Sequence, residues 1–319
     1  MKGDTLHLQF GRDKDGKRLA VNLKMKDAPN VRTAKGVRIV KDAGRYYATF
    51  VIDRRPRRKK IPKEPKLAYI DPNSKNLGYG VSIDGQAFEI DNLPGLRELD
   101  HRIDKLKRKR DRCAKRSQKV EFTREDGSVH VHWEPSRAWT RRNTALQKLE
   151  KKRREQIKQF QYSLSHLLLD RYDVLGIGNW SPTNGQSGLG KKATRTLRGR
   201  RQLGALRARL QWVAQKKGKV VHVLDESGTT RTCHGCGHVM AGGIHPSKRE
   251  WDCPECGSHH HRDENAAQNG LHRLMSVDGF HRVPSSGRVA VTRRSRWSCR
   301  PGGRWMEGDW SVPQAQAIK

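Results

Sequence analysis

The sequence predicts a mixed α/β fold, and three observations carry this prediction. Three short apolar strands follow one another after residue 65, helical and strand patterns then alternate, and a cysteine-rich insertion precedes a last helix. The chain has 319 residues, which is enough for two or three modules. Only 34% of the residues are hydrophobic, so we expect the core to be concentrated in parts of the chain.

The first part of the chain, residues 1–53, is predicted to form a small β-barrel. Its apolar segments are short, and turn sequences such as Asp15-Gly16 separate them. The predicted strands cover residues 6–10, 19–23, 37–40 and 46–52. Residues 54–65 hold a run of Arg and Lys with several prolines, which predicts a basic linker. This linker could be a solvated connector or could lie along phosphate groups.

A meander of three strands is predicted next. Residues 66–71 form an apolar strand that ends in a carboxylate, and residues 76–83 and 86–90 give the next two strands. Asp84-Gly85 joins these two strands and is a strong hairpin sequence.

A basic helical hairpin is predicted after the meander. Residues 93–117 have helical periodicity, with leucine and isoleucine on one face and Arg and Lys elsewhere. A second long helix covers residues 138–169. Between the two helices, residues 119–135 alternate valine with charged residues around Asp126-Gly127, which indicates a hairpin insertion.

The second half of the chain continues the alternation. Strands at 172–177 and 219–224 flank a Gly-, Ser- and Pro-rich loop at 181–192 and a helix at 197–215, and a last helix covers 263–274. This order is that of an RNase H-like domain with insertions. Residues 276–319 are rich in Arg, Gly and Ser, so we expect a basic tail that is disordered without a polyanion.

The charge of the chain favours nucleic acid as the partner. Lys and Arg total 67 against 33 Asp and Glu, a formal charge of +34. Such an excess repels itself unless a polyanion neutralises it. No segment approaches the roughly 18 apolar residues of a membrane span, and the first residues lack the apolar core of a signal peptide. We therefore expect no membrane partner and a cytoplasmic location.

Four of the six cysteines predict a zinc site. Cys233 and Cys236 form one pair, and Cys253 and Cys256 form a second, with two residues inside each pair. Pairs at this spacing direct four thiolates at one point and close a structural, tetrahedral zinc site. Such a site is typical of a reducing compartment, where disulfides are rare. Cys113 and Cys299 stand alone and are interpreted as incidental.

Three carboxylates predict a magnesium-dependent nuclease site. Asp71 ends the first strand of the meander, Glu226 follows the strand at 219–224, and Asp263 begins the last helix. Hydrolysis of phosphodiesters by two metals needs carboxylates that converge on two divalent ions. Each residue also has a simpler interpretation: Asp71 as a turn residue, Asp263 as a helix N-cap, and Glu226 as a loop acid with Asp225 as its competitor.

Three short segments resemble the TnpB (OrfB) family of transposon-encoded, RNA-guided RuvC-like nucleases. Residues 71–77 resemble the first RuvC motif, residues 229–237 the entry to the zinc ribbon, and residues 263–267 the third RuvC motif. The resemblance implies a guide RNA and target DNA as partners, with structural Zn²⁺ and catalytic Mg²⁺. It also implies a RuvC-like domain at 66–228 and 258–275, which contains a zinc ribbon at 229–257.

The chain departs from the family pattern in two places. The usual second-motif glutamate is replaced by Gly178-Asn179, and neither residue supplies a charged ligand. Some members, and the Fanzor proteins, use a glutamate just before the ribbon, and Glu226 fits that relocated position. The second departure is the wedge-like domain at 1–53, in which the usual helical recognition lobe is missing or truncated.

Three functions remain open on the sequence alone. The resemblance favours an RNA-guided, Mg²⁺-dependent DNA endonuclease that acts in the bacterial cytoplasm or nucleoid. The missing acid at 178–179 leaves a nuclease-silent, RNA-guided DNA-binding repressor as the alternative. The short N-terminal region leaves an unguided RuvC-like nuclease as the third. Neither the guide sequence, the motif beside the target nor the oligomeric state can be obtained from the sequence.

Overall fold

The computed structural model describes residues 5–26, 34–52, 61–73, 75–180, 197–245, 247–277, 289–300 and 303–309. The chain divides into two compact units, Met1–Arg55 and Pro56–Lys319, and each is described by itself.

The first unit consists of two β-hairpins among its described residues. Strands β1 (Thr5–Arg12) and β2 (Arg18–Lys24) pair antiparallel in one two-stranded sheet. Strands β3 (Gly36–Asp42) and β4 (Arg45–Val51) pair in another. The left-handed residues Ala43 and Gly44 (φ 51° and 79°) make the tight turn between β3 and β4. The four predicted strands are present, but the described residues do not confirm that they close into a barrel.

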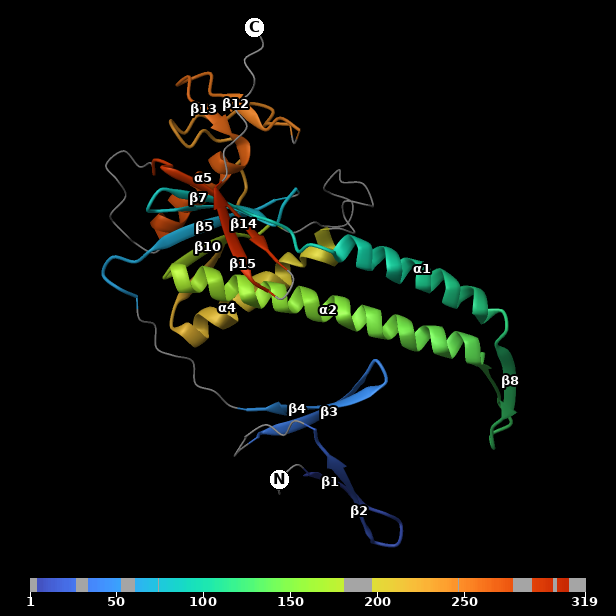
Figure 1. Cartoon of the computed structure of the whole chain (residues 1–319). Coiled ribbons are helices and arrows are strands. Elements are labelled where there is room, and N and C mark those ends of the chain that lie inside the picture. The colour runs from blue at the N-terminus through green and yellow to red at the C-terminus, as the bar shows by residue number, and fades with distance from the viewer. Residues whose placement is uncertain are drawn as a thin grey trace. The chain divides into compact units, whose positions relative to one another are not determined.

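A seven-stranded mixed sheet forms the centre of the second unit, in the order β11-β10-β5-β6-β7-β14-β15 (Figure 1). Strands β5 (Leu67–Pro72), β6 (Gly78–Ser82) and β7 (Gln86–Ile90) form the predicted antiparallel meander. Strands β10 (Val174–Gly178) and β11 (Val220–Leu224) run parallel to β5. The central mixed sheet agrees with the predicted mixed α/β class.

Helices cover both faces of this sheet. Because successive side chains of a strand point to opposite faces, Ala68 and Ile70 pack on one side, and Leu67 and Tyr69 pack on the other. The first face lies against α2 (Arg137–Arg171) and α4 (Leu203–Lys217). The second face lies against α5 (Arg262–Val277).

Gly270 lets helix α5 approach the sheet closely. A methyl group at this position would overlap the ring of Tyr69, which is fully buried on β5. The close approach brings the start of α5, where Asp263 lies, to the edge of the sheet at which β5 ends.

The prediction of a disordered tail is wrong for the two segments of the tail that form strands in the structure. Strand β14 (Arg293–Cys299) pairs parallel with β7, and β15 (Trp305–Asp309) pairs antiparallel with β14. The ring of Trp297, which is 1% exposed, stacks on Phe88 with 4.1 Å between ring centroids. Ser295, Trp297 and Cys299 point inward, and the arginines at positions 293, 294 and 296 hide this strand pattern in a basic sequence. Cys299, interpreted as incidental, therefore belongs to the core.

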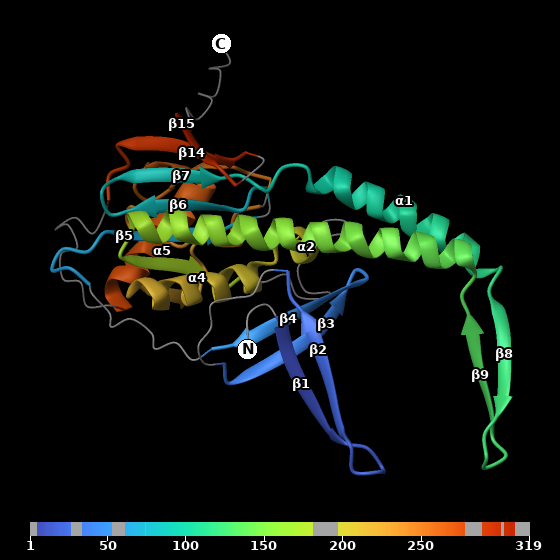
Figure 2. The ribbon, with the colours of Figure 1, turned by 60° about the horizontal axis from the view of Figure 1, so that its bottom comes forward.

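The predicted helical hairpin and its insertion are both present. Helix α1 (Leu96–Ala114) packs along the first half of α2 through a short apolar seam of Leu99, Ile103 and Leu146. Strands β8 (Gln118–Thr123) and β9 (Val129–Glu134) form the hairpin that joins the two helices. Figure 2 shows this hairpin at the end of the two helices that is far from the sheet. We call α1, β8, β9 and residues 137–156 of α2 the arm.

The predicted helix at 197–215 is interrupted. A π-helical turn (Leu197–Arg201) precedes α4, and Gln202 between them has a φ of 48°. The side chain of Arg201 is buried and donates hydrogen bonds to the carbonyl of Asn73 and the side chain of Asn92. The predicted loop at 181–192 lies outside the described residues. None of the described helices has both the length and the hydrophobicity that crossing a membrane requires.

Candidate metal centres and catalytic site

The four paired cysteines come together as predicted. The Sγ atoms of Cys233, Cys236, Cys253 and Cys256 all lie within 4.8 Å of one another. In the parts of the chain that the structure describes, no other group of three or more His, Cys, Asp or Glu side chains meets this distance. No disulfide links them. Four thiolates at this spacing could bind one tetrahedral zinc ion.

Two turns with the same hydrogen bonds present these sulfurs. The backbone N–H of Cys233 donates to the carbonyl of His238 (2.8 Å), and the N–H of Gly237 donates back to the carbonyl of Cys233 (2.9 Å). The second turn repeats this pattern. The backbone N–H of Cys253 donates to the carbonyl of Ser258 (2.9 Å), and the N–H of Gly257 donates to the carbonyl of Cys253 (2.8 Å). Gly237 and Gly257 both have positive φ, at 80° and 69°, which each turn needs to close behind its two cysteines.

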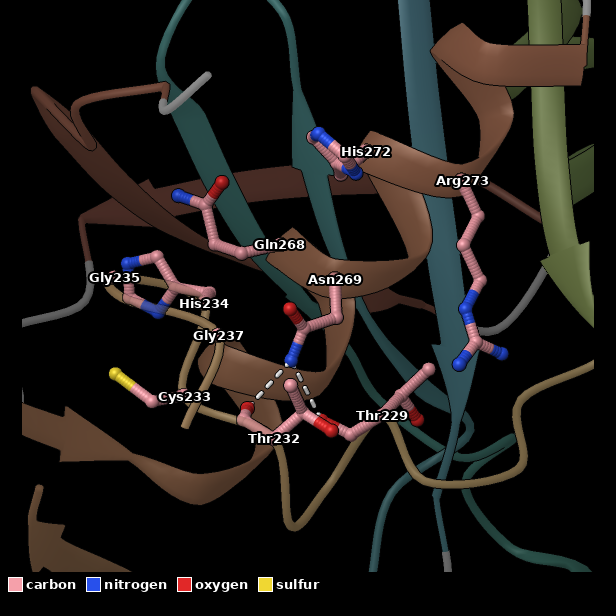
Figure 3. A pocket seen from close by; sticks show the side chains of 10 residues that line it. All are labelled: Thr229, Thr232, Cys233, His234, Gly235, Gly237, Gln268, Asn269, His272 and Arg273. Atoms are coloured by element: carbon pink, nitrogen blue, oxygen red, sulfur yellow. Dashed lines mark hydrogen bonds between the residues drawn. The ribbon is translucent and has the colours of Figure 1, made fainter. Parts of the chain in front are cut away.

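Two asparagines attach the cysteine region to helix α5. The side chain of Asn265 donates to the carbonyl of Thr232 (2.8 Å) and accepts from the N–H of His234 (2.9 Å). Asn269, one turn later, donates to the carbonyls of Thr229 (2.8 Å) and Thr232 (2.7 Å; Figure 3). The first cysteine turn is therefore fixed to the same helix that carries Asp263 near its start.

The alanines after Asn265 have a packing role. Ala266 and Ala267 are 1% and 0% exposed, and Ala267 lies in the apolar cluster between α5 and the sheet. The segment at 263–267 thus places an acid at the sheet edge, an amide on the cysteine turn and two small residues against the strands.

A cavity of about 360 Å³ lies between the first cysteine turn and α5 (Figure 3). Arg273, one of its lining residues, donates to the carbonyls of Asp225 (2.7 Å) and Ser227 (2.8 Å). These bonds fix both neighbours of Glu226, so α5 also positions the second candidate carboxylate.

Asp71 and Glu226 meet at the edge of the sheet where the parallel strands end. Asp71 lies near the end of β5, and Glu226 follows β11 by two residues. Strand β10 lies between β5 and β11 and ends at Gly178. A methyl group at position 178 would overlap Oε2 of Glu226 and would lie 2.9 Å from Cδ of Pro72. The carboxylate of Glu226 therefore fills the space that a side chain at position 178 would occupy.

Crowding of the acids changes their protonation. Burial raises the pKa of Asp71 well above its usual range, and the charges of Glu226 and Asp263 raise it further. Burial also raises the pKa of Glu226 to about 7, although the Arg207 guanidinium and the proton that Asp71 donates to Glu226 oppose this rise. The acids are thus gathered with too little positive charge, which is the condition that a bound divalent cation relieves.

Asp263 is close to this pair but has partners of its own. The residue is 8% exposed, and its carboxylate accepts a hydrogen bond from Nδ2 of Asn73 (2.6 Å). Nη1 of Arg249, from the cysteine region, contacts both of its oxygens at 3.0 and 2.8 Å. In this arrangement Asp71, Glu226 and Asp263 do not form one compact ligand group, since only the cysteines meet that criterion among the described residues.

Two observations fit a metal ion at Glu226. Its Oε2 atom is buried and has no hydrogen-bond partner within the described part of the chain. Asp225, its competitor in the sequence, is exposed, and its Oδ1 accepts from Nδ2 of Asn179 at 3.2 Å. Of the two neighbours, Glu226 is the one that faces Asp71.

Sequence reasoning missed the residues that hold these acids. Arg207 donates to the carbonyls of Gly178 and Trp180 and so holds the end of β10, while Asn73 and Arg249 hold Asp263. Asn73 could have been found, because it belongs to the segment that carries Asp71. The arginines are individually indistinguishable among the 67 basic residues.

Comparison with known proteins gives matches in sequence and in structure. Residues 204–269 match the family model of the Cas12f1-like TNB domain. The TnpB-like protein L79 of Acanthamoeba polyphaga mimivirus is 31% identical over 136 residues, which cover 40% of this chain and 25% of that protein. The CRISPR-associated DNA-binding protein Cas12m of Allomeiothermus silvanus is 32% identical over 149 residues, covering 44% and 27%. The chain thus spans about a quarter of the length of these curated relatives.

Solved structures give a more distant likeness. A Cas12f1–sgRNA–target DNA complex is matched over 85% of this chain and 68% of that chain, with 14% identity and a TM-score of 0.40. A CRISPR-Cas12f ternary complex is matched over 71% and 41%, with 13% identity and a TM-score of 0.41. The family model and the sequence relatives together support a protein of the TnpB family.

Proposed function

We propose that this TnpB-like chain is an RNA-guided, Mg²⁺-dependent DNA endonuclease with an RNase H-like catalytic domain. It binds a guide RNA and cleaves the DNA strand that pairs with it. The observation that carries the proposal is the fit of the Glu226 carboxylate over Gly178, beside Asp71. This fit supports a relocated ligand, because an acid reaches the position where the second-motif acid is missing.

Asp71, Glu226 and Asp263 would hold the divalent ions at the edge of the sheet. When bound, such ions activate a water molecule and stabilise the leaving oxygen of the phosphodiester. The protein residues position the ligands for that purpose. Arg207 fixes the end of β10 under Glu226, and Asn73 orients Asp263. Loss of the proton that Asp71 and Glu226 share would accompany metal binding, because metal ligands must be ionised.

The cysteine cluster would hold zinc with a structural role. All four ligands come from the protein, so no coordination position is left for substrate. The bonds from Asn265 and Asn269 connect this cluster to the helix of Asp263, and Arg249 connects it to Asp263 directly. The zinc region thereby supports the geometry of the catalytic edge.

A second function, a nuclease-silent RNA-guided DNA binder, is favoured by one observation. Arg249 contacts both carboxylate oxygens of Asp263, and the three acids do not form one compact ligand group among the described residues. One relative is named a DNA-binding protein. An unguided nuclease, the third possibility, would share the carboxylates but would bind no specific RNA.

One experiment separates these functions. The protein is purified, its RNA is sequenced, and the complex is given matched DNA with Mg²⁺ or Mn²⁺. We expect a structured RNA to co-purify and the matched DNA to be cut. Glu226→Gln keeps the shape of the side chain and removes its charge, so cutting should fall by about 100-fold or more while RNA and DNA binding persist.

Asp225→Asn is the matched control, because Asp225 is the exposed neighbour of Glu226. It should cut at nearly the wild-type rate. Wild-type cutting by Glu226→Gln together with an inactive Asp225→Asn would mean that the ligand is Asp225. Tight binding of matched DNA without cutting in either metal would establish the silent binder instead.

A further inference from the structure

A pocket between two tryptophans lies at the end of the arm. Helix α1 ends at Ala114, the β8–β9 hairpin follows, and α2 begins at Arg137. The pocket has a volume of about 300 Å³, at the lower end of the range of ligand pockets. Its lining residues are small except for two indoles: Ala114, Ser117, Trp133, Pro135 and Trp139.

We propose that this pocket binds an unpaired base of an RNA strand, by stacking against Trp133 and Trp139. The inference deepens the proposed function, because it rests on RNA being the partner of this chain. It does not depend on the catalytic carboxylates or on cleavage.

The hairpin beside the pocket exposes an unusual amount of apolar surface. Trp133 is 64% exposed, and Val129 and Val131, which share its face of β9, are 62% and 42% exposed. A two-stranded hairpin is marginally stable in water, and no other strand of the described chain pairs with this one. Contiguous apolar side chains at the tip of a projecting element indicate a contact surface.

The charge around the pocket favours a polyanion over a protein. Residues 105–116, which lead into the hairpin, contain eight Lys or Arg and one Asp. A second copy of this chain would bring the same positive charge against itself. Aromatic side chains flanked by basic residues are the arrangement that binds single-stranded nucleic acid, since phosphates meet the cations and bases meet the rings.

The two indoles have different settings. The backbone N–H of Trp139 donates to the hydroxyl of Ser136, the N-cap of α2, at 3.3 Å, and the Arg110 guanidinium lies 5.7 Å from the centroid of the Trp139 ring. The capped helix start positions the backbone of Trp139, and the cation–π contact with Arg110 favours one placement of its ring as a wall of the pocket. Trp133 stands on the hairpin with most of its surface exposed, where a base can cover it.

The distance between the pocket and the carboxylates, set by the length of the arm, favours RNA over the DNA strand to be cut as the bound strand. Helix α2 has 35 residues, about 50 Å at 1.5 Å per residue, and residues 160–169 carry its contacts with the core near the sheet. The pocket therefore lies tens of ångströms from the carboxylates, away from the strand to be cut. Folded RNA offers unpaired bases in loops and bulges at such distances, and these bases stack on aromatic side chains.

The test uses the full chain and fluorescently labelled RNA of one mixed 20-nucleotide sequence, either single-stranded and unstructured or annealed to its complement. Trp133→Ala and Trp139→Ala should each weaken single-strand binding by roughly 5- to 100-fold, the effect of losing one stacked base. Duplex binding should change less than about twofold. Trp133→Phe should retain most of the affinity, because the ring is kept.

Two variants control for general effects. Trp212→Ala removes a tryptophan of α4 that is 43% exposed, and Val120→Ala alters the same hairpin on the face opposite to Trp133 and outside the pocket lining. Both should bind single-stranded RNA like the wild type. Ultraviolet cross-linking of wild-type protein to the RNA should place the cross-link at residue 133 or 139, which tests the pocket without relying on a folded variant.

Unchanged RNA binding by both alanine variants, with no cross-link in the pocket, would overturn the inference while leaving the proposed function intact. A self-association that Trp133→Ala abolishes, with RNA binding unchanged, would make the surface an interface between copies. If the alanine variants weaken the binding of single-stranded DNA of the same sequence but not of RNA, the pocket binds DNA and the inference of an RNA base is wrong. A wild-type protein that binds no RNA would overturn the inference and the proposed function together.

Discussion

The cysteine cluster and the carboxylate cluster belong to the same unit of this chain, but they are assembled in different ways. The cysteines come from two turns with the same hydrogen bonds, a short distance apart in the sequence. The acids come from the end of β5, the segment after β11 and the start of α5. Spacing along the chain creates the first site, whereas the topology of the sheet creates the second.

The electrostatic cost of assembly also differs between the two sites. Thiols can gather as neutral groups before a metal arrives. Carboxylates that gather at a buried edge repel one another, and here a shared proton and the Arg249 guanidinium reduce that repulsion. A site made by topology should therefore depend on the whole sheet and respond to nearby charge, and a site made by spacing should not.

The test with the largest expected effect removes β14 and β15, the edge of the sheet that is farthest from β11. A chain that ends at Val277 lacks β14 and β15 and uncovers Phe88, on which Trp297 stacks. Removal of one buried tryptophan already costs about 3–5 kcal/mol, so loss of both strands should abolish cooperative unfolding and all cutting. Zinc content, measured by metal analysis, should stay near one ion per chain because the cysteine turns are local.

Trp297→Ala is the graded form of this test, and Met306→Ala on β15 is its control. Met306 is 38% exposed, so its truncation should cost less than about 1 kcal/mol. If Trp297→Ala releases zinc as readily as it lowers the melting temperature, the two sites are not independent.

The next test adds a side chain beneath Glu226. Gly178→Ala should displace the carboxylate, because the new methyl group would overlap Oε2 of Glu226. We expect DNA cutting to fall by about 100-fold while zinc content and RNA binding stay unchanged. Gly204→Ala on α4 is the control, since nothing lies within 4 Å of its new methyl group.

A double variant sharpens this test. Gly178→Glu combined with Glu226→Ala moves the acid to the end of β10 and removes the side chain that it would meet. Recovery of cutting, relative to Glu226→Ala alone, would show that the site needs an acid at this point and not at a particular position in the chain. No recovery, with a stable fold, would count against the shared position.

The sequence predicted the elements that depend on local pattern. The strands of the meander, the two long helices and the hairpin between them, and the cysteine turns follow from periodicity, turn residues and spacing. These features need only neighbours within one or two elements. The sequence also proposed three acids at element ends, and the structure brings Asp71 and Glu226 together, but the role of the three acids as metal ligands stays a prediction.

The sequence failed where a distant contact decides the structure. Strand β14 exists because β7 offers a free edge and Phe88 offers a surface for Trp297, and neither fact is visible in an arginine-rich segment. In the same way, Gly178 seemed only to lack an acid, but it provides space for Glu226. The salt bridge between Arg249 and Asp263 joins residues whose pairing depends on the folded cysteine region.

The cysteine site should respond to its own ligands alone. Cys253→Ser should abolish zinc binding and unfold the cysteine region locally, because that region has a core of only a few residues around Trp251. Cutting should fall by about tenfold through the contacts with α5, which is less than with Gly178→Ala. Glu255→Gln, an exposed change inside the second turn, should retain zinc. A Cys253→Ser protein with full zinc content would refute the four-cysteine site.

Charge next to the carboxylate site should tune its metal affinity. Arg249→Gln removes the guanidinium that contacts both oxygens of Asp263. A metal ion then no longer has to displace this partner, so the Mg²⁺ concentration for half-maximal cutting should fall by about tenfold. Lys248→Gln, the exposed neighbour, should leave it unchanged. A higher requirement for Mg²⁺ would show that Arg249 positions Asp263 for the metal instead of competing with it.

The smallest expected effect is a pH dependence of stability that only the carboxylate site should show. The pKa of Glu226 rises from 4.5 to about 7 on folding, so the folded protein binds more protons than the unfolded chain in this window. Stability should therefore fall as pH rises from 4.5 to 7 and then level off. Glu226→Gln removes this contribution. With zinc bound and no Mg²⁺ added, the melting temperature of the variant minus that of the wild type should therefore increase by a few degrees from pH 5 to pH 8. Saturating Mg²⁺ should shrink the gain, because a cation then compensates the ionised acid. A difference that is constant across this pH range would mean that Glu226 is ionised throughout and that its burial carries no protonation cost.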